Sequence, residues 1–183
     1  PFYNTVSPSM DILISSNLER LLYLLSGGDD KLVAGYMKEL SDTGCYQVSE
    51  EMRKKIQSVF VGGFSSEAET EATIGKMMDE HKYLIDTHTA VAFHVLEQYR
   101  KETGDQTKTV VASTASPFKF CDAVLDALNV TDKATGTALL DQLAEVSGMP
   151  APQPLATLKD KQVRFTSWTE KEQMRAVVTD FLK

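Results

Sequence analysis

Residues 109–117 read Thr-Val-Val-Ala-Ser-Thr-Ala-Ser-Pro, a short β-branched run followed by hydroxyl side chains and a proline. Such an apolar run between polar flanks is typical of a strand buried in a parallel sheet. Proline is favoured in the first turn of a helix, so a helix is expected after Ser116. The stretch therefore predicts a strand over Thr109–Ala112, then a hydroxyl-rich loop, then a helix.

Amphipathic helices are predicted for most of the remaining chain, because apolar residues recur every three to four positions. Hydroxyl and acidic residues that favour helix N-termini precede several of these segments, at Pro8-Ser9, Asp29-Asp30, Ser49, Ser65-Ser66 and Asp86. Glycines that favour helix ends follow at Gly27-Gly28, Gly44 and Gly104. The pattern predicts about seven helices, and Val163–Thr166 is a second short strand candidate.

Two isolated strands do not make a stable sheet. If Thr109–Ala112 is a strand buried on both faces, its neighbours must come from another polypeptide segment. The chain also opens on Pro1-Phe2-Tyr3 rather than on Met. We therefore expect a helix-rich α/β fold in which residues 1–183 form a single unit taken from a larger domain.

The net charge of the chain limits the kinds of partner that it can bind. Its 183 residues carry 26 Asp and Glu against 19 Lys and Arg, which gives a net charge of -7. An acidic protein repels nucleic-acid phosphates and anionic lipids, and no apolar run approaches the roughly 20 residues that span a bilayer. We expect no nucleic acid and no membrane as partners. Cys45 and Cys121 are expected to be reduced thiols in a cytoplasmic protein.

Two hydroxyl-rich clusters lie at predicted helix entries. The first, residues 4–12, reads Asn-Thr-Val-Ser-Pro-Ser-Met-Asp-Ile, and the second is Ser113–Pro117. Free backbone N–H groups at a helix start bind anions, and ligands bind at the carboxyl ends of parallel strands. Simple helix capping is the other explanation of both clusters, and composition alone favours it. His81, His88 and His94 have no metal-ligand spacing, and no metal is expected.

Three segments carry a resemblance to a known family. Residues 4–22, from Asn4-Thr5-Val6-Ser7-Pro8-Ser9-Met10-Asp11 to Leu22, are similar to a signature stretch of threonine synthases. Asp86-Thr87-His88-Thr89-Ala90-Val91 resembles the family's Asp-Pro-His-Thr-Ala-Val segment, with Thr87 in place of proline. Ser113–Phe120 resembles the family's Thr-Ala-His-Pro-x-Lys-Phe, with Ser116 where many members have His.

The resemblance implies the C-terminal portion of a pyridoxal-phosphate enzyme of fold type II, the tryptophan-synthase-β type. Such an enzyme converts O-phospho-L-homoserine and water to L-threonine and phosphate. The resemblance implies that Thr114, with Ser113, binds the cofactor by facing its pyridine nitrogen. It implies substrate-side roles for Ser7, Ser9 and Asp11. Asp86 and His88 are weaker candidates, because Asp86 as a helix cap explains that segment almost as well.

The resemblance also implies what is missing. The Schiff-base lysine and the phosphate-binding glycine loop of this fold type lie earlier in the chain, and the sequence holds no counterpart; Lys119 matches a different family lysine. We therefore expect no catalytic residue, no bound cofactor and no activity in this chain alone, with the N-terminal half of the enzyme as its partner. Unpaired strand edges would cause self-association or rearranged packing. The alternative is a non-enzymatic helical module for protein–protein contact.

Overall fold

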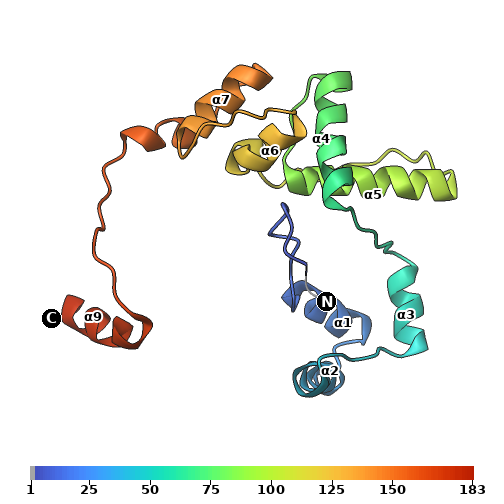
Figure 1. Ribbon diagram of the computed structural model, residues 1–183. Helices are drawn as coiled ribbons and strands as arrows, with labels where there is room; N and C mark the ends of the chain where they lie inside the picture. Colours follow the sequence, from blue (N-terminus) through green and yellow to red (C-terminus); the bar gives the residue numbers. More distant parts are fainter. Residues whose placement is uncertain (1–2) are drawn as a thin grey trace.

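The computed structural model describes residues 3–183 as an open arrangement of helices (Figure 1). The α-helices are α1 (Ser16–Leu25), α2 (Asp30–Thr43), α3 (Glu50–Gln57), α4 (Glu67–His81), α5 (Thr87–Thr103), α6 (Cys121–Ala127), α7 (Ala138–Ser147), α8 (Gln153–Ala156) and α9 (Met174–Phe181). Three short 3₁₀ helices lie at Pro117–Lys119, Leu158–Asp160 and Lys171–Gln173. The prediction of about seven helices is too low, because nine α-helices occur within residues 3–183.

The first group of helices, α1 to α3, encloses a small core of its own. Leu22 of α1, Val33 and Tyr36 of α2 and Met52 of α3 are its buried residues. The ring of Tyr46 stacks on that of Tyr36, with the centroids 5.3 Å apart. Four buried side chains make a modest core, so this group gains little stability from apolar burial.

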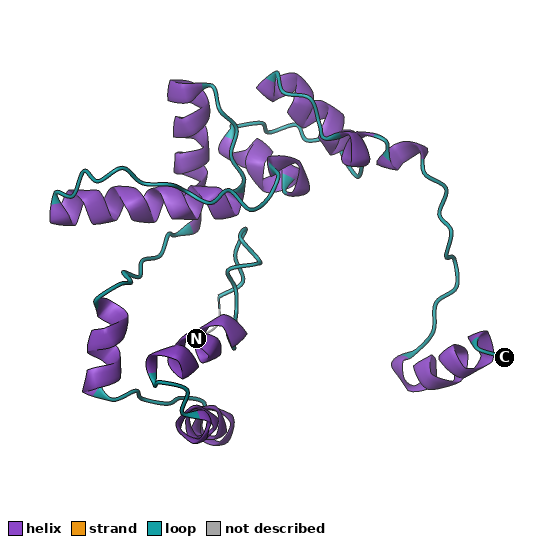
Figure 2. Ribbon diagram, turned by 180° about the vertical axis from the view of Figure 1, so that it is seen from behind, coloured by secondary structure: helices purple, strands orange, loops and turns teal. Residues whose placement is uncertain are grey.

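The second group, α4 to α8, holds the larger core. Helices α4 and α5 cross each other and α6 packs against α4, as the reverse view in Figure 2 shows. Ile74 of α4, Val124 and Leu125 of α6 and Leu143 of α7 are completely buried. Gly75 lets α6 approach closely, because a Cβ atom there would lie 3.2 Å from the carbonyl oxygen of Ala127. This core fixes α5, which carries the candidate site at its N-terminus.

Several helix boundaries confirm the cap predictions. The Ser66 hydroxyl accepts a hydrogen bond from the Glu69 N–H while the Glu69 carboxylate accepts one from the Ser66 N–H, a capping box. Ser49 caps α3 in the predicted way. Gly44 and Gly104 end α2 and α5 in the left-handed conformation that glycine adopts without strain. Local side-chain chemistry is therefore sufficient to place these ends.

The first helix begins later than predicted. Residues 7–10 form a turn in which the Met10 N–H donates to the Ser7 carbonyl at 2.8 Å, and α1 begins only at Ser16. The cap is Ser15, whose hydroxyl accepts from the Leu18 N–H, rather than Ser9. The prediction of a helix from Met10 is wrong, because residues 4–12 fold into a loop closed by their own side chains.

The two predicted strands are wrong for this structure. Within residues 3–183 no segment pairs as a strand, as the colouring of Figure 2 shows. Thr109, Val110 and Ala112 lie outside any helix and are exposed, Val110 to 91%, and Val111 is half-buried. Val163–Thr166 is likewise extended and exposed. A strand exists only through hydrogen bonds to a neighbour, and neither run is paired with another segment of residues 3–183.

An exposed arm leads to the last helix. Residues 161–168 are extended and solvent-exposed, and α9 lies at the end of this segment, far from the other helices (Figure 1). The arm carries exposed Phe165 and Trp168, and every residue of α9 is exposed. No helix described by the structure has both the length and the apolar character required to cross a bilayer.

The two cysteines are both free thiols, as predicted, in different environments. Cys45 is exposed, whereas Cys121 is buried at the start of α6, where its Sγ donates to the Phe118 carbonyl at 3.2 Å. Burial raises the pKa of the Cys121 thiol, so its reactive thiolate is disfavoured at neutral pH. We expect Ellman's reagent to modify Cys45 at least about 100-fold faster than Cys121 in the native protein. Equal rates, with Cys45→Ser as the control, would contradict the buried position of Cys121.

Candidate functional site

Three segments that are distant in sequence meet at the N-terminus of α5. They are the Thr5–Asp11 loop, the Asp86–Thr89 cap of α5, and the Ser113–Thr114 segment that follows the exposed extended run. Residues 84–90 are all buried, which is the longest buried stretch in the described part of the chain. These are the three segments that the sequence singled out, and the structure joins them by hydrogen bonds.

Asp86 lies at the centre of this network. Its side chain is completely buried and caps α5, and Oδ1 accepts hydrogen bonds from the N–H groups of His88 at 2.9 Å and Thr89 at 3.3 Å. Oδ2 accepts from the Thr89 hydroxyl. A buried carboxylate is tolerated only when its oxygens are occupied in this way. The predicted role of Asp86 as the N-cap is confirmed, and the carboxylate also organises the side chains around it.

His88 connects Asp86 to the N-terminal loop. Its Nδ1 lies 3.2 Å from Asp86 Oδ1, and its Nε2 accepts a hydrogen bond from the Ser9 N–H at 3.1 Å. Because a backbone N–H only donates, Nε2 carries no proton, and Nδ1 carries the proton that it donates to Asp86. The two contacts therefore select the neutral Nδ1–H tautomer. His88 acts here as a connector between two segments 79 residues apart.

Thr89 connects the same carboxylate to the third segment. The Thr89 and Ser113 hydroxyl oxygens are 3.1 Å apart. The Thr89 hydroxyl has one proton, which it directs to the Asp86 carboxylate or to the Ser113 hydroxyl, and both acceptors lie within hydrogen-bond distance. Ser113 is thus held in place by a buried residue although it is itself exposed. The neighbouring Thr114 is exposed, and its hydroxyl has no hydrogen-bond partner among the described residues.

The Thr5–Asp11 loop is closed by a carboxylate of its own. Asp11 accepts hydrogen bonds from the Thr5 N–H and from the Thr5 hydroxyl, both at 2.7 Å. The Thr5 hydroxyl in turn accepts from the Ser7 N–H at 3.1 Å. Glu67 of α4 fixes the loop from outside by accepting the Val6 N–H at 3.0 Å. Both Asp11 oxygens are therefore engaged in shaping the loop.

Ser7 is the unexplained polar group of the site. Its side chain is only 2% exposed, and its hydroxyl has no hydrogen-bond partner in the described structure. A buried hydroxyl without a partner costs about 1–3 kcal/mol, so native proteins rarely keep one without a reason. Ser9 contributes through its backbone, whereas its side chain is exposed. Of the three predicted substrate-side residues, Ser7 alone offers a buried, unoccupied hydroxyl.

Sequence reasoning missed two contributors to this site. The ring of Phe120 packs against the His88 imidazole with the centroids 4.8 Å apart, which restrains the tilt of that ring. Glu67 of α4 anchors the N-terminal loop by accepting the Val6 N–H. Both contacts join residues far apart in sequence, so no local pattern could reveal them. Lys119 lies beside Phe120, with its ammonium 5.9 Å from the ring centroid.

The remaining histidines are separate from this site. His94 pairs with Gln98 on α5 at 2.9 Å, and His81 ends α4 in an exposed position. Within residues 3–183 no three His, Cys, Asp or Glu side chains gather as metal ligands would.

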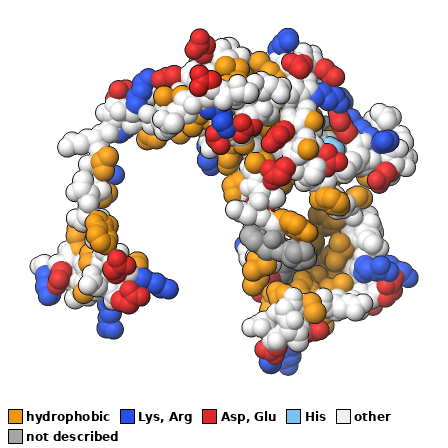
Figure 3. Space-filling model, viewed as in Figure 1, with side chains coloured by type: hydrophobic (Ala, Val, Ile, Leu, Met, Phe, Trp, Pro, Cys, Tyr) orange, Lys and Arg blue, Asp and Glu red, His pale blue; other side chains and the backbone are white. Residues whose placement is uncertain are grey.

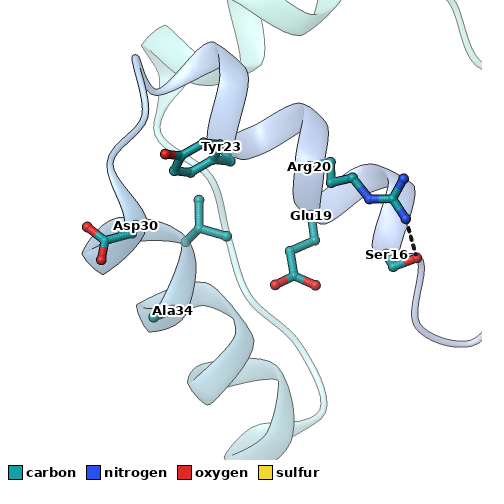
Figure 4. Close-up of a pocket in the computed structure, with 7 residues that line it drawn as sticks. Ser16, Glu19, Arg20, Tyr23, Asp30 and Ala34 are labelled. Carbon is teal, nitrogen blue, oxygen red and sulfur yellow. Dashed lines mark hydrogen bonds between the residues drawn. The ribbon is translucent and has the colours of Figure 1, made fainter.

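A groove of about 380 Å³ lies between α1 and α2, away from the hydrogen-bond network. Figure 4 shows Arg20, Glu19 and Tyr23 of α1 opposite Asp30 and Ala34 of α2, with Arg20 Nη2 donating to Ser16 Oγ at 3.5 Å. The groove is open to solvent, and its charged side chains point in different directions rather than toward a common point. The arrangement is that of a solvated helix–helix groove.

The tautomer of His88 is directly measurable. We expect a two-dimensional ¹⁵N–¹H spectrum of the imidazoles to show His88 with a protonated Nδ1 and an unprotonated Nε2. The exposed His81 serves as the internal control, and it should show the solution mixture of tautomers with Nε2–H in excess. A His88 signal dominated by Nε2–H would mean that the Ser9 contact does not exist in solution.

Comparison with known proteins places this site in a family context. Residues 89–178 match the family model described as "Threonine synthase, C-terminal". "Threonine synthase-like 1" from Macaca fascicularis is 34% identical over 147 residues, which are 80% of this chain and 19% of that protein. The chain thus spans about a fifth of the length of this relative.

Two solved structures cover the whole of this chain. The pyridoxal-phosphate-bound threonine synthase from Brucella melitensis matches with a TM-score of 0.76 and 33% identity, over 34% of its own length. The threonine synthase from yeast matches with a TM-score of 0.79 and 29% identity, over 37% of its length. The open arrangement of helices is therefore shared with about one third of these longer chains.

Proposed function

We propose that this chain, which belongs to the threonine synthase family as the C-terminal portion of its members, forms one wall of a threonine synthase active site. The reaction would convert O-phospho-L-homoserine and water to L-threonine and phosphate. One observation carries the proposal: the three motif segments, separated by 79 and 24 residues at their contacts, form a single hydrogen-bond network. The relative named above and both solved structures are longer than this chain, so the reaction belongs to an assembled enzyme.

The residues present suit a pyridoxal phosphate site. When bound, this cofactor supplies the electron sink for elimination and replacement chemistry. Thr114, whose exposed hydroxyl has no partner in the described residues, would face the pyridine nitrogen, and Ser113 would hold that segment through Thr89. A neutral hydroxyl partner leaves the ring nitrogen unprotonated, which favours elimination over transamination.

The N-terminal loop would form the substrate side. The buried Ser7 hydroxyl is the donor that the loop leaves unoccupied. Asp11 would act by closing the loop rather than by touching substrate, because both of its oxygens bind Thr5. Ser9 would act through its N–H, which fixes the loop to His88. In this arrangement the loop positions Ser7, and α5 positions the loop.

We infer that the isolated chain does not catalyse the reaction. We infer that the chain needs the cofactor-binding half of the enzyme, which would supply the Schiff-base lysine and the phosphate-binding loop. The whole enzyme would act in the cytoplasm.

A phosphate-release assay tests the proposed reaction. The enzyme that contains these 183 residues should release phosphate from O-phosphohomoserine and form threonine in equal amounts. The isolated chain with added pyridoxal phosphate should do neither and should show no absorbance band of bound cofactor. Activity of the complete enzyme on another amino-acid substrate, without threonine formation, would refute the assignment.

The second candidate function is a non-enzymatic helical module for protein contact. The observation that favours it is the exposed apolar surface of α9, where Val177, Val178 and Phe181 are 51% or more accessible. This candidate predicts tight binding to a protein that has no part in amino-acid synthesis, together with a cofactor-free complex. Restoration of phosphate release by the remainder of a threonine synthase would favour the first candidate.

A further inference from the structure

Thr87, the first residue of α5, is completely buried, and its hydroxyl faces the ring of His88. Thr87 Oγ1 lies 3.4 Å from His88 Nδ1, which is its one hydrogen-bond contact within residues 3–183. The start of the helix does not require this residue type, because proline suits the first helical position and lacks an N–H that would stay unpaired there. The Thr87 N–H donates no hydrogen bond to any described residue. What threonine adds at this position is therefore its hydroxyl.

The Asp86 oxygen nearest to the His88 ring is already occupied by two other donors. Asp86 is the only carboxylate among the buried side chains of the described residues, whereas Figure 3 shows acidic side chains spread over the surface of the second helix group. Asp86 Oδ1 accepts the N–H groups of His88 and Thr89, and His88 Nδ1 lies farther from it than the nearer of these, at 3.2 Å. A carboxylate oxygen has two lone pairs, and the two N–H groups use both. The Nδ1 proton thus has only a shared acceptor in Asp86.

The Thr87 hydroxyl is the second acceptor within reach of that proton. Nδ1 lies between Thr87 Oγ1 and Asp86 Oδ1, and one proton shared by two oxygens gives the slightly long distances of a three-centre hydrogen bond. The reverse assignment, in which Thr87 donates to Nδ1, would place the ring proton on Nε2. There it would meet the Ser9 N–H, which is also a donor. The contacts on both sides of the ring therefore assign Thr87 as an acceptor.

We propose that Thr87 is a positioning residue for the substrate-side loop and that it acts through the His88 ring. Its hydroxyl keeps the ring proton on Nδ1, so that Nε2 stays free to accept the Ser9 N–H. The contact with Ser9 in turn holds the loop that carries the buried Ser7 hydroxyl. The inference rests on the proposed function for the identity of the substrate, O-phospho-L-homoserine.

Thr87→Val tests the hydroxyl, because valine fills the same space without it. In the enzyme that contains these 183 residues, KM for O-phosphohomoserine should rise about 5-fold, the effect of losing one net hydrogen bond, while kcat should change by less than about 2-fold. The ¹⁵N–¹H imidazole spectrum should show a larger share of the Nε2–H tautomer of His88. The Ser9 amide should exchange faster with solvent. Thr87→Ser restores a hydroxyl and should return these readouts toward those of the unmodified enzyme.

Thr73→Val is the matched control for removing a hydroxyl from a buried threonine. Thr73 is 6% exposed, and its hydroxyl donates to the Glu69 carbonyl at 2.7 Å within α4, away from the imidazole of His88. This variant should leave KM, the His88 tautomer and the exchange of the Ser9 amide unchanged. Thr87→Pro separates the hydroxyl from the stability of the helix. It should reproduce the effects of Thr87→Val without lowering the urea midpoint, because proline favours the helix start.

Two results would overturn the proposal. Unchanged KM, tautomer and Ser9 exchange in Thr87→Val and Thr87→Pro would show that the Thr87 side chain only fills space. A His88 ring that carries its proton on Nε2 in the unmodified enzyme would show that Thr87 donates to Nδ1. If Thr87→Val does not fold, Thr87→Pro provides the same comparison. A shifted tautomer and faster Ser9 exchange in an enzyme that releases no phosphate from O-phosphohomoserine would support the positioning role and refute the proposed reaction instead.

Discussion

Replacement of Asp86 by alanine is expected to lower the free energy of unfolding by about 3 kcal/mol. The substitution removes the N-cap of α5, which is worth about 1 kcal/mol, and leaves the buried partners His88 and Thr89 without their acceptor, which costs about 1–3 kcal/mol more. The carboxylate is completely buried, so water cannot replace it. Urea denaturation followed by circular dichroism measures the change as a shift of the midpoint.

Asp29 offers a matched control for this prediction. It caps α2 by accepting a single hydrogen bond from the Leu32 N–H at 2.9 Å, and it is exposed. Asp29→Ala should cost about 1 kcal/mol or less, because only the cap is lost. Equal losses for the two variants would mean that the network around His88 and Thr89 adds nothing to the cap. Asp86→Ala should also release the Thr5–Asp11 loop, which faster amide exchange at Ser9 would report.

The second large effect is a loss of catalytic rate, and it is expected for substitution of Thr114 in the assembled enzyme. Thr114→Val keeps the size of the side chain and removes its hydroxyl, and we expect kcat for phosphate release to fall about 100-fold, the usual cost of removing one preorganised donor. Thr114→Ser should retain most of the activity. Because the hydroxyl is proposed to face the ring nitrogen, the absorbance of the bound cofactor should change as well.

Thr135 provides the control for that experiment. It is an exposed threonine in the loop before α7, outside the hydrogen-bond network. Thr135→Val should leave kcat, cofactor affinity and absorbance unchanged. If Thr114→Val behaves like Thr135→Val, another residue faces the ring nitrogen. If Thr114→Val loses cofactor altogether, its role is in binding rather than in setting the chemistry.

Helix boundaries were predictable where their causes are local. Ser66 and Glu69 are three residues apart, and Asp86 bonds to N–H groups two and three positions later, so the sequence contains both partners. The start of α1 was not predictable in this way. Met10 to Ile14 have an apolar helical pattern, but Asp11 binds Thr5 and draws the segment into a loop. A side chain that hydrogen-bonds within a loop competes with helix formation, and the spacing of apolar residues does not reveal that competition.

The strand prediction failed for a different physical reason. The composition of Thr109–Ala112 favours a strand, and the segment is extended in the structure. What it lacks is a neighbour, and a strand is a property of a pair rather than of a sequence. The contacts within the candidate site likewise depend on pairs of segments. The motifs indicate the three segments, but the contact between Ser9 and His88 depends on how α4 packs against α5, which no single segment encodes.

The extended arm also has a consequence for how proteases cut the protein. Residues 161–168 are exposed and free of helix, with Lys161 and Arg164 as cleavage sites for a trypsin-like protease. Proteases cut exposed, extended segments before they cut folded helices. A cut there would remove α9 and leave the two helix groups intact. Limited trypsin digestion should therefore separate α9 from the two helix groups before it cuts within them.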